Sequence, residues 1–293
     1  MVGQELLTLK RSASRGIESG RLLPYPFKTF QEYEIDFRTS SITLIAGPPG
    51  SMKSILATNL IHKMEYPDGS KPTCLYFSND TNERTTASRV LAMITDTPTR
   101  ECQEIIVNDK EFAAKVLGEW SHVALCYKKN PDLPYIINQA DAYAEVWGDY
   151  PDQTVVDILM NVDYDGAGEM NFWDLMKEFN ILAEDWDTHL VIVHHTSESA
   201  KAGSPPPRSA LMGKNAHLPA VIITLWGDSE EETLDLAKVK NRNGKQDPEA
   251  KHPFRMRAYA DKNRLEEIES VDVLFHDGLG VPENVKVDKM EDF

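Results

Sequence analysis

The chain has 293 residues, 41% of them hydrophobic, enough for one large α/β domain or two small ones with a sizeable core. Its 31 basic and 47 acidic residues give a formal net charge of −16, which argues against a protein that coats a polyanion. The longest apolar run, 220–226, has a strand's length and the N-terminus has no apolar leader, so we expect no membrane span or secretory signal. Three widely spaced cysteines, Cys74, Cys102 and Cys126, are typical of a reduced, cytoplasmic protein.

Residues 1–40 predict an irregular lead-in, and a buried strand is predicted over 42–46. A turn rich in glycine and proline follows this strand, and a helix is predicted over 55–64. Strand, glycine-bearing turn, Lys-Ser and helix are the context of a phosphate-binding P-loop. We therefore predict an ATP site formed by Gly47, Pro48, Pro49, Gly50, Ser51, Met52, Lys53 and Ser54. Lys53 would bind the β- and γ-phosphates, and the Ser54 hydroxyl would ligate Mg²⁺.

The match to the P-loop pattern G-x-x-x-x-G-K-[ST] departs at one position, because Met52 replaces the second glycine. We expect Met52 to begin the helix with a negative φ and to turn its side chain away from the nucleotide. Pro48 and Pro49 have no N–H groups, so the donors to phosphate come mainly from residues 50–54. The alternative is an ordinary strand–turn–helix with a chance Lys-Ser.

Further strands and helices alternate along the chain. Strands are predicted over 73–78, 122–127, 154–160, 190–194, 221–226 and 233–239, and helices over 85–95, 109–120, 133–147 and 172–186. Alternation of this kind indicates βαβ units and a mainly parallel sheet flanked by helices. We expect an α/β core over 41–260 and an acidic tail over 261–293.

Asp157 lies near the end of one predicted strand, where a P-loop enzyme needs a carboxylate to hold Mg²⁺. The alternative is an aspartate that only caps a loop. The segment that follows, 161–166, opens like a calcium-binding loop, but Phe172 stands where the glutamate at position twelve belongs. We therefore do not expect calcium binding there.

Three further motifs, together with the P-loop, resemble the RecA-like ATPases of the DnaB replicative-helicase type, including its short phage and plasmid members. They are Phe77-Ser-Asn-Asp80, the strand ending in His194-His195, and Ala237-Lys-Val-Lys-Asn-Arg-Asn-Gly244. The resemblance implies that Asp80, where the family usually has glutamate, is the general base, with Glu83 as a possible aid. An Asp that starts a turn is the alternative reading of Asp80.

The resemblance also implies that His195, at a position where DnaB proteins carry glutamine, senses the γ-phosphate. The alternative is that one of the two histidines is a core residue and the other merely polar; they cannot share a metal ion, since neighbours on a strand face opposite ways. By the same resemblance, Lys240 and Arg242 complete the nucleotide site of a neighbouring subunit in trans. The active unit is then a homo-oligomer, a ring and most simply a hexamer. The alternative is a basic turn on a solvated hairpin.

The segment 196–216 matches the family's inner DNA-facing loop and carries Lys201, Arg208 and Lys214, which suit a single-stranded DNA backbone. A locally basic stretch, 238–264, is also compatible with an enclosed nucleic-acid site. The hypothesis is an ATP-dependent DNA helicase or translocase acting on single-stranded DNA in replication or recombination. A RecA-like recombination or strand-annealing ATPase is the alternative. A nucleotide-gated assembly protein that does not bind DNA is the more distant one.

Overall fold

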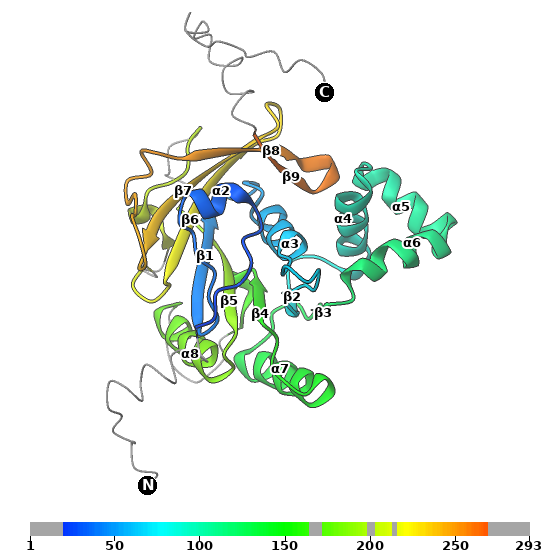
Figure 1. The fold of residues 1–293 in the computed structure, drawn as a ribbon, viewed down its shortest axis with the longest axis horizontal. Coiled ribbons are helices and arrows are strands. Elements are labelled where there is room, and N and C mark those ends of the chain that lie inside the picture. The colour runs from blue at the N-terminus through cyan, green and yellow to red at the C-terminus, as the bar shows by residue number, and fades with distance from the viewer. Residues whose placement is uncertain (1–19, 164–171, 198–202, 213–215, 269–293) are drawn as a thin grey trace, which may run out of the picture.

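A nine-stranded sheet forms the centre of the computed structural model, which describes residues 20–163, 172–197, 203–212 and 216–268 (Figure 1). The strands lie in the order β3-β2-β4-β5-β1-β6-β7-β8-β9. The six from β3 to β6 are parallel, and the last three pair antiparallel. The prediction of a mainly parallel α/β sheet is therefore confirmed.

The strands are β1 (Ser41–Gly47), β2 (Cys74–Ser78), β3 (Val123–Cys126), β4 (Gln153–Asp157), β5 (His189–His195), β6 (Val221–Asp228), β7 (Thr233–Asn241), β8 (Phe254–Tyr259) and β9 (Arg264–Glu267). The α-helices among the described residues are α2 (Lys28–Glu32), α3 (Lys53–Lys63), α4 (Glu83–Thr95), α5 (Thr99–Asn108), α6 (Lys110–Leu117), α7 (Leu133–Trp147) and α8 (Phe172–Asp185). None of them is long and apolar enough to cross a lipid bilayer.

Side chains of the central strand alternate between two hydrophobic cores, one on each face of the sheet. Ile45 of β1 belongs to the core that also contains Leu56 and Leu60 of α3. Its neighbour Leu44 belongs to the core shared with α7 and α8. The alternation follows from the two-residue period of a strand. Because both faces are covered, β1 is buried from Ile42 to Gly47 and mostly apolar, as buried parallel strands are.

Local capping sets the bounds of the helices. The Asn82 side chain accepts a hydrogen bond from the Thr85 N–H at the start of α4. The Asp132 side chain does the same for Tyr135 at the start of α7, and Gly148 ends that helix with φ of +88°. Side-chain acceptors at N-caps and glycine after the last turn are the usual signals for these positions.

The structure extends beyond the predicted elements in two places. Residues 99–108 form α5, which was not predicted, and the helix expected over 109–120 is α6 followed by a short 3₁₀ turn. The last strands, β8 and β9, were also missed, and β9 continues the sheet past residue 260, where we expected the acidic tail to begin. The rest of that tail, 269–293, lies outside the described residues.

Part of the lead-in belongs to the core. Phe30 of α2 is fully buried, and its ring meets that of Phe254 in β8 edge-on, with centroids 5.6 Å apart. Phe37 packs beside it, at 5.7 Å between ring centroids. Residues 20–40 thus cover one face of the sheet and form no separate unit.

Candidate nucleotide-binding site

Four predicted site residues meet at the carboxyl edge of the parallel strands. Gly47, the last residue of β1, pairs in register with His195 of β5. Asp157 ends β4 opposite Ser78 of β2, two residues before Asp80. Ligands of open α/β sheets bind at this edge, near the point where the strand order reverses. The topology therefore brings together residues that lie far apart in the sequence.

The P-loop runs from the end of β1 to the start of α3 and folds tightly on itself. The carbonyl of Pro48 accepts hydrogen bonds from the Ser51 N–H at 3.2 Å and the Ser51 hydroxyl at 2.7 Å. The Lys53 Nζ donates to the carbonyls of Gly47 and Pro48, at 3.1 and 2.6 Å. Gly50 has φ of +78°, a left-handed conformation that favours glycine. The ammonium group is thereby held over the loop.

Met52 does not adopt the conformation that we predicted. Its φ is +68° and its ψ 24°, because α3 begins one residue later, at Lys53, and the residue before it makes the turn into the helix. The expectation of a negative φ is therefore wrong. Glycine is usual at this position because it adopts a positive φ without strain, as well as because it is small. The Met52 side chain is buried and lies against Gly227 of β6.

Burial and two nearby carboxylates act on the pKa of Lys53 in opposite directions. Burial lowers the pKa of its ammonium group to about 8, and the carboxylates of Asp157 and Asp80 oppose that shift. Asp80 itself is exposed on the loop after β2. Its charge also acts on Asp157 and His195, so it belongs to the same site. Glu83 begins α4, and its charge acts on Tyr127.

Asp157 is buried and firmly oriented. The Tyr76 hydroxyl donates a 2.6 Å hydrogen bond to its Oδ2, and Ser54 lines the same pocket. Burial raises the pKa of Asp157, while the Tyr76 hydrogen bond, the Ser54 hydroxyl and the Lys53 charge lower it. The Asn79 amide donates to the Ile158 carbonyl at 3.0 Å and accepts from the Ile158 N–H, which fixes the backbone after Asp157.

This donor set fits Mg²⁺ bound together with phosphate. The described residues hold no group of three His, Cys, Asp or Glu side chains able to cage a metal ion. One hydroxyl and one carboxylate, Ser54 and Asp157, are what Mg²⁺ requires when phosphate oxygens and water supply its other ligands. Lys53 lies close enough to Asp157 for their charges to interact, so phosphate and metal positions would adjoin.

The two adjacent histidines have different surroundings, as expected for neighbours on a strand. His194 is buried, with its Nε2 3.3 Å from the Met212 carbonyl and its ring edge-on to Phe172. His195 faces the P-loop: burial lowers its pKa most, then the Lys53 charge, while the Gly47 carbonyl and Asp80 raise it. Its position suits the predicted sensor role, which stays a prediction.

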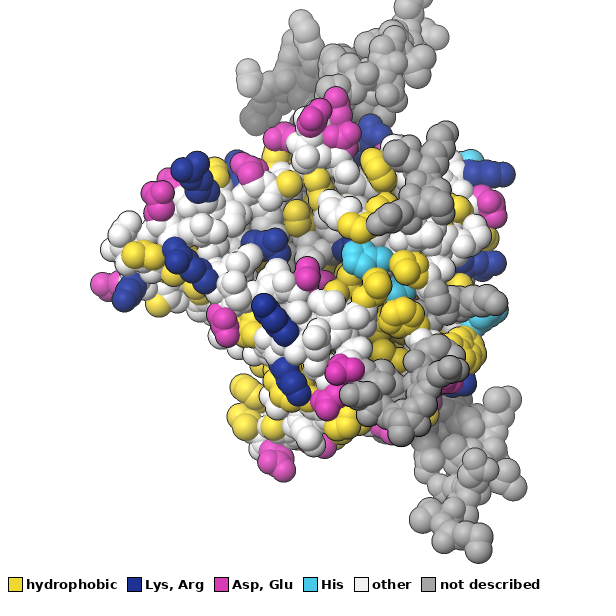
Figure 2. Space-filling model, turned by 180° about the vertical axis from the view of Figure 1, so that it is seen from behind, with side chains coloured by type: hydrophobic (Ala, Val, Ile, Leu, Met, Phe, Trp, Pro, Cys, Tyr) yellow, Lys and Arg dark blue, Asp and Glu magenta, His cyan; other side chains and the backbone are white. Residues whose placement is uncertain are grey.

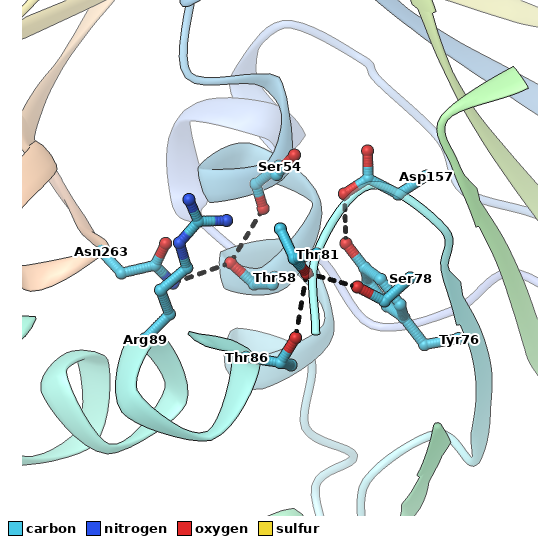
Figure 3. Close-up of a pocket in the computed structure, with 9 residues that line it drawn as sticks. All are labelled: Ser54, Thr58, Tyr76, Ser78, Thr81, Thr86, Arg89, Asp157 and Asn263. Atoms are coloured by element: carbon cyan, nitrogen blue, oxygen red, sulfur yellow. Dashed lines mark hydrogen bonds between the residues drawn. The ribbon is translucent and has the colours of Figure 1, made fainter. Parts of the chain in front are cut away.

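Arg89 is a residue that the sequence analysis missed. It lies on α4 and lines a small pocket between α3, β2 and α4, together with Ser54 and Asp157 (Figure 3). Its side chain extends toward α3 and ends between Ser54 and Asn263 (Figure 3). Arg89 lies one helical turn after Thr86, which the structure buries, and the sequence alone carried no signal for this inward side of the helix.

Lys240 and Arg242 lie at the opposite end of the parallel strands from the P-loop. β7 is antiparallel to β6. The backbone N–H of Arg242 donates to the Ala220 carbonyl, and the Ala220 N–H donates to the Ile42 carbonyl at the start of β1. At about 3.3 Å per residue, Arg242 is roughly 15 Å from Gly47 along the strands. Neither cation can complete the P-loop of its own chain.

These two cations bind backbone carbonyls and form a cluster with a third. The Lys240 Nζ donates to Ala216 and His217 at 2.8 and 2.7 Å, and Arg242 donates to His217 and Leu218 at 3.1 and 2.9 Å. Burial lowers the pKa of Lys240 to about 8, assisted by the charges of Arg242 and Arg208.

The basic stretch 238–264 does not form one surface. Lys238 is buried and bonds the Tyr33 carbonyl, whereas Lys262 and Arg264 pair with Asp96 at 3.1 and 3.2 Å near the other end of the sheet. Over the lobe of α4 to α6, basic and acidic side chains are interspersed (Figure 2). Lys201 and Lys214 of the expected DNA-facing loop lie outside the described residues.

The candidate P-loop at the end of the central strand, the buried aspartate at the end of β4 and the antiparallel extension after β6 belong to a RecA-like α/β fold. Two solved structures share it. One is a DnaB-like replicative helicase studied for its interactions with primase (TM-score 0.72, 12% identity, 92% of this chain and 69% of that one). The other is the ATPase domain of a second protein (TM-score 0.72, 13% identity, 90% of this chain and all of that one).

Similar sequences come from phages. The gene 65 protein of Mycobacterium phage L5 is 28% identical over 242 residues, which cover 78% of this chain and 87% of that protein. The gene 65 protein of Mycobacterium phage D29 is 28% identical over 219 residues, 71% of this chain and 90% of that protein. Residues 27–118 also match the model of the nephrocystin 3 N-terminal family, a segment that contains the P-loop.

Proposed function

We propose that this chain is a Mg²⁺-dependent ATPase that works as a homo-oligomer and moves along, or remodels, single-stranded DNA. The observation that carries the proposal is the meeting of Lys53, Ser54, Asp157 and Asp80 at one edge of the sheet. The resemblance in fold to a helicase and to an ATPase domain supports it. The gene 65 proteins carry names that describe no activity.

Each of these side chains has a distinct task in hydrolysis. The P-loop N–H groups and Lys53 bind the β- and γ-phosphates, with the partial positive charge at the N-terminus of α3. Mg²⁺, when bound through Ser54 and Asp157, neutralises charge on the phosphate oxygens. Asp80 accepts the proton of the attacking water. It is exposed, so its carboxylate is free to approach that water.

The transition state needs further positive charge, which we assign to the neighbouring subunit. Lys240 and Arg242 are too far from their own P-loop, and with Arg208 they form a cluster of like charges. Such a cluster favours an anion, and the γ-phosphate of an adjacent protomer is one of suitable charge. A cation supplied in this way raises the rate by roughly 10³ or more.

Steady-state ATP hydrolysis with and without single-stranded DNA tests the proposal, with Lys53→Ala as the blank. We expect hydrolysis that DNA stimulates and that the blank lacks. Directional displacement of a strand from a forked duplex would identify a helicase, whereas faster duplex formation would identify an annealing ATPase. Hydrolysis that ignores DNA would favour a nucleotide-gated assembly protein. Absence of hydrolysis in the wild-type chain would reject the ATPase.

A further inference from the structure

The P-loop approaches β6 closely at two glycines, Gly47 and Gly227. A Cβ built on Gly47 would lie 2.8 Å from the Leu225 carbonyl oxygen. A Cβ built on Gly227 would lie 2.8 Å from Cγ and 2.9 Å from Sδ of Met52, and 3.2 Å from the Ser51 carbonyl. A Cβ does not lie within 3.0 Å of a non-bonded heavy atom, so an alanine at position 227 would force the Met52 side chain to move. The chain therefore leaves room at Gly227 for the Met52 side chain.

Met52 holds a backbone conformation that side-chain-bearing residues seldom adopt. Its φ of +68° lies in the left-handed region, where the glycine of the P-loop pattern carries no penalty. Its side chain is 9% exposed and belongs to the core that contains Ile45 and Leu225. Burial of this flexible thioether side chain offsets the unfavourable backbone. In other P-loops a glycine at this position adopts the left-handed φ without strain. Here the contact of the Met52 side chain with Gly227 stabilises the same backbone conformation.

We propose that Met52 is a positioning residue that fastens the P-loop to β6, and that Gly227 is the seat it requires. The Met52 carbonyl accepts from the Leu56 N–H in the first turn of α3, and Lys53 is the next residue. The side-chain seat therefore sets the start of the helix and the position of the ammonium group. The nucleotide readout below rests on the proposed function.

A double-mutant cycle tests this pair. The variants are Gly227→Ala, Met52→Gly and the two combined, each titrated with a fluorescent ATP analogue and Mg²⁺. Gly227→Ala should weaken binding about tenfold, because its methyl group displaces Met52. In the Met52→Gly background, where the loop has a glycine and the Ser51 carbonyl is the nearest atom left to the new methyl group, Gly227→Ala should change affinity by about twofold or less. Gly118→Ala is the control, since a Cβ there meets no atom within 4 Å.

Thermal melting of the same variants without nucleotide separates the possible failures. An equal loss of affinity from Gly227→Ala in both backgrounds would overturn the pairing. A lower melting temperature with unchanged affinity would make Met52 a packing residue only, which also overturns the proposal. If the wild-type chain bound no nucleotide, the proposed function would fail, whereas a non-additive melting cycle would still reveal the contact between Met52 and Gly227.

Discussion

The hydroxyl of Tyr76 in β2 donates a 2.6 Å hydrogen bond to the carboxylate of Asp157 at the end of the adjacent strand β4. Both side chains are buried, with 2% and 6% of their surface exposed. A buried hydroxyl and a buried carboxylate satisfy each other in this way, and the bond fixes the direction of the carboxylate. One oxygen is held by tyrosine, so the group can present the other toward Ser54.

Replacing Tyr76 with Phe should weaken the use of Mg²⁺. We expect ATP hydrolysis to need about tenfold more Mg²⁺ for half-maximal rate, as is typical when the partner of a metal-binding carboxylate is removed. Loss of the bond also raises the pKa of Asp157, so activity should fall at a higher pH as the solution is acidified. Tyr25→Phe is the matched control, because Tyr25 donates a similar bond to Asp36 away from the site. Equal Mg²⁺ curves for both variants would contradict the assignment.

The affinity for ATP should fall with rising pH. The pKa of Lys53 is about 8, well below the usual 10.5, and only the protonated ammonium attracts phosphate. Affinity should be level below that pH and then drop by up to about tenfold per pH unit. Lys53→Arg, whose guanidinium stays protonated, should lack the slope. Binding is the better readout than hydrolysis, because Lys240 also has a pKa of about 8. A flat wild-type profile to about pH 9.5 would speak against this role.

Arg89→Ala should reduce ATP turnover by about tenfold or more while leaving the fold intact. The guanidinium lines the pocket beside Ser54 and Asp157, where phosphate and metal charges would gather. Arg84→Ala provides the comparison, since Arg84 is an exposed residue of the same helix. Single-turnover hydrolysis and circular dichroism measure the two effects. The same rate in both variants would remove Arg89 from the site.

Mixing two inactive variants should restore hydrolysis if the site is shared between subunits. Lys53→Ala protomers keep an intact Arg242, and Arg242→Ala protomers keep an intact P-loop. In a random equal mixture, about a quarter of the interfaces pair the intact P-loop of an Arg242→Ala protomer with the intact Arg242 of a Lys53→Ala protomer. Activity of the mixture near that fraction, with each variant alone inactive, is the expected result. A mixture that stays inactive, although the protomers co-assemble, would leave Lys240 and Arg242 with a structural role.

Asn59→Ala should lower the free energy of unfolding by about 2 kcal/mol, because it leaves buried backbone groups without a hydrogen-bond partner. The fully buried Asn59 amide donates to the carbonyls of Ile55 and Asn263 at 2.8 and 2.9 Å, and its oxygen accepts from the Leu265 N–H at 3.0 Å. Asn180→Ala on α8 is the control, as its bond to Glu184 is exposed. Urea unfolding should separate the two variants clearly. Equal midpoints would show that the contact between α3 and β9 contributes little.

The elements that sequence reasoning located well carry their own local signals. The helix α7 has the predicted bounds, 133–147, because Asp132 caps its start and Gly148 ends it. The P-loop is visible because strand, turn and helix follow one another within a short stretch. Asp157 was identified from its place at the end of a strand, and its hydrogen bond from Tyr76 lies between strands adjacent only in space.

The features that were missed depend on distant contacts. Met52 was assigned the wrong φ because a glycine was treated as a matter of space alone, and its seat at Gly227 is 175 positions further along the chain. The approach of Arg208 to Lys240 likewise arises only from folding. The strand β8 was missed for a different reason. Its residues alternate between the buried and the more exposed side, a pattern that the sequence Phe-Arg-Met-Arg-Ala-Tyr indicates, but this segment was taken for the end of the core.

The antiparallel course of β7 has a consequence for the isolated protomer. The protomer carries both halves of the proposed catalytic centre and cannot bring them together, because they lie at opposite ends of the strands. Specific activity should therefore rise with protein concentration and vanish on dilution. If Lys240 and Arg242 act in trans as proposed, a newly made protomer would consume no ATP until it met others of its kind, so its abundance would decide when hydrolysis starts.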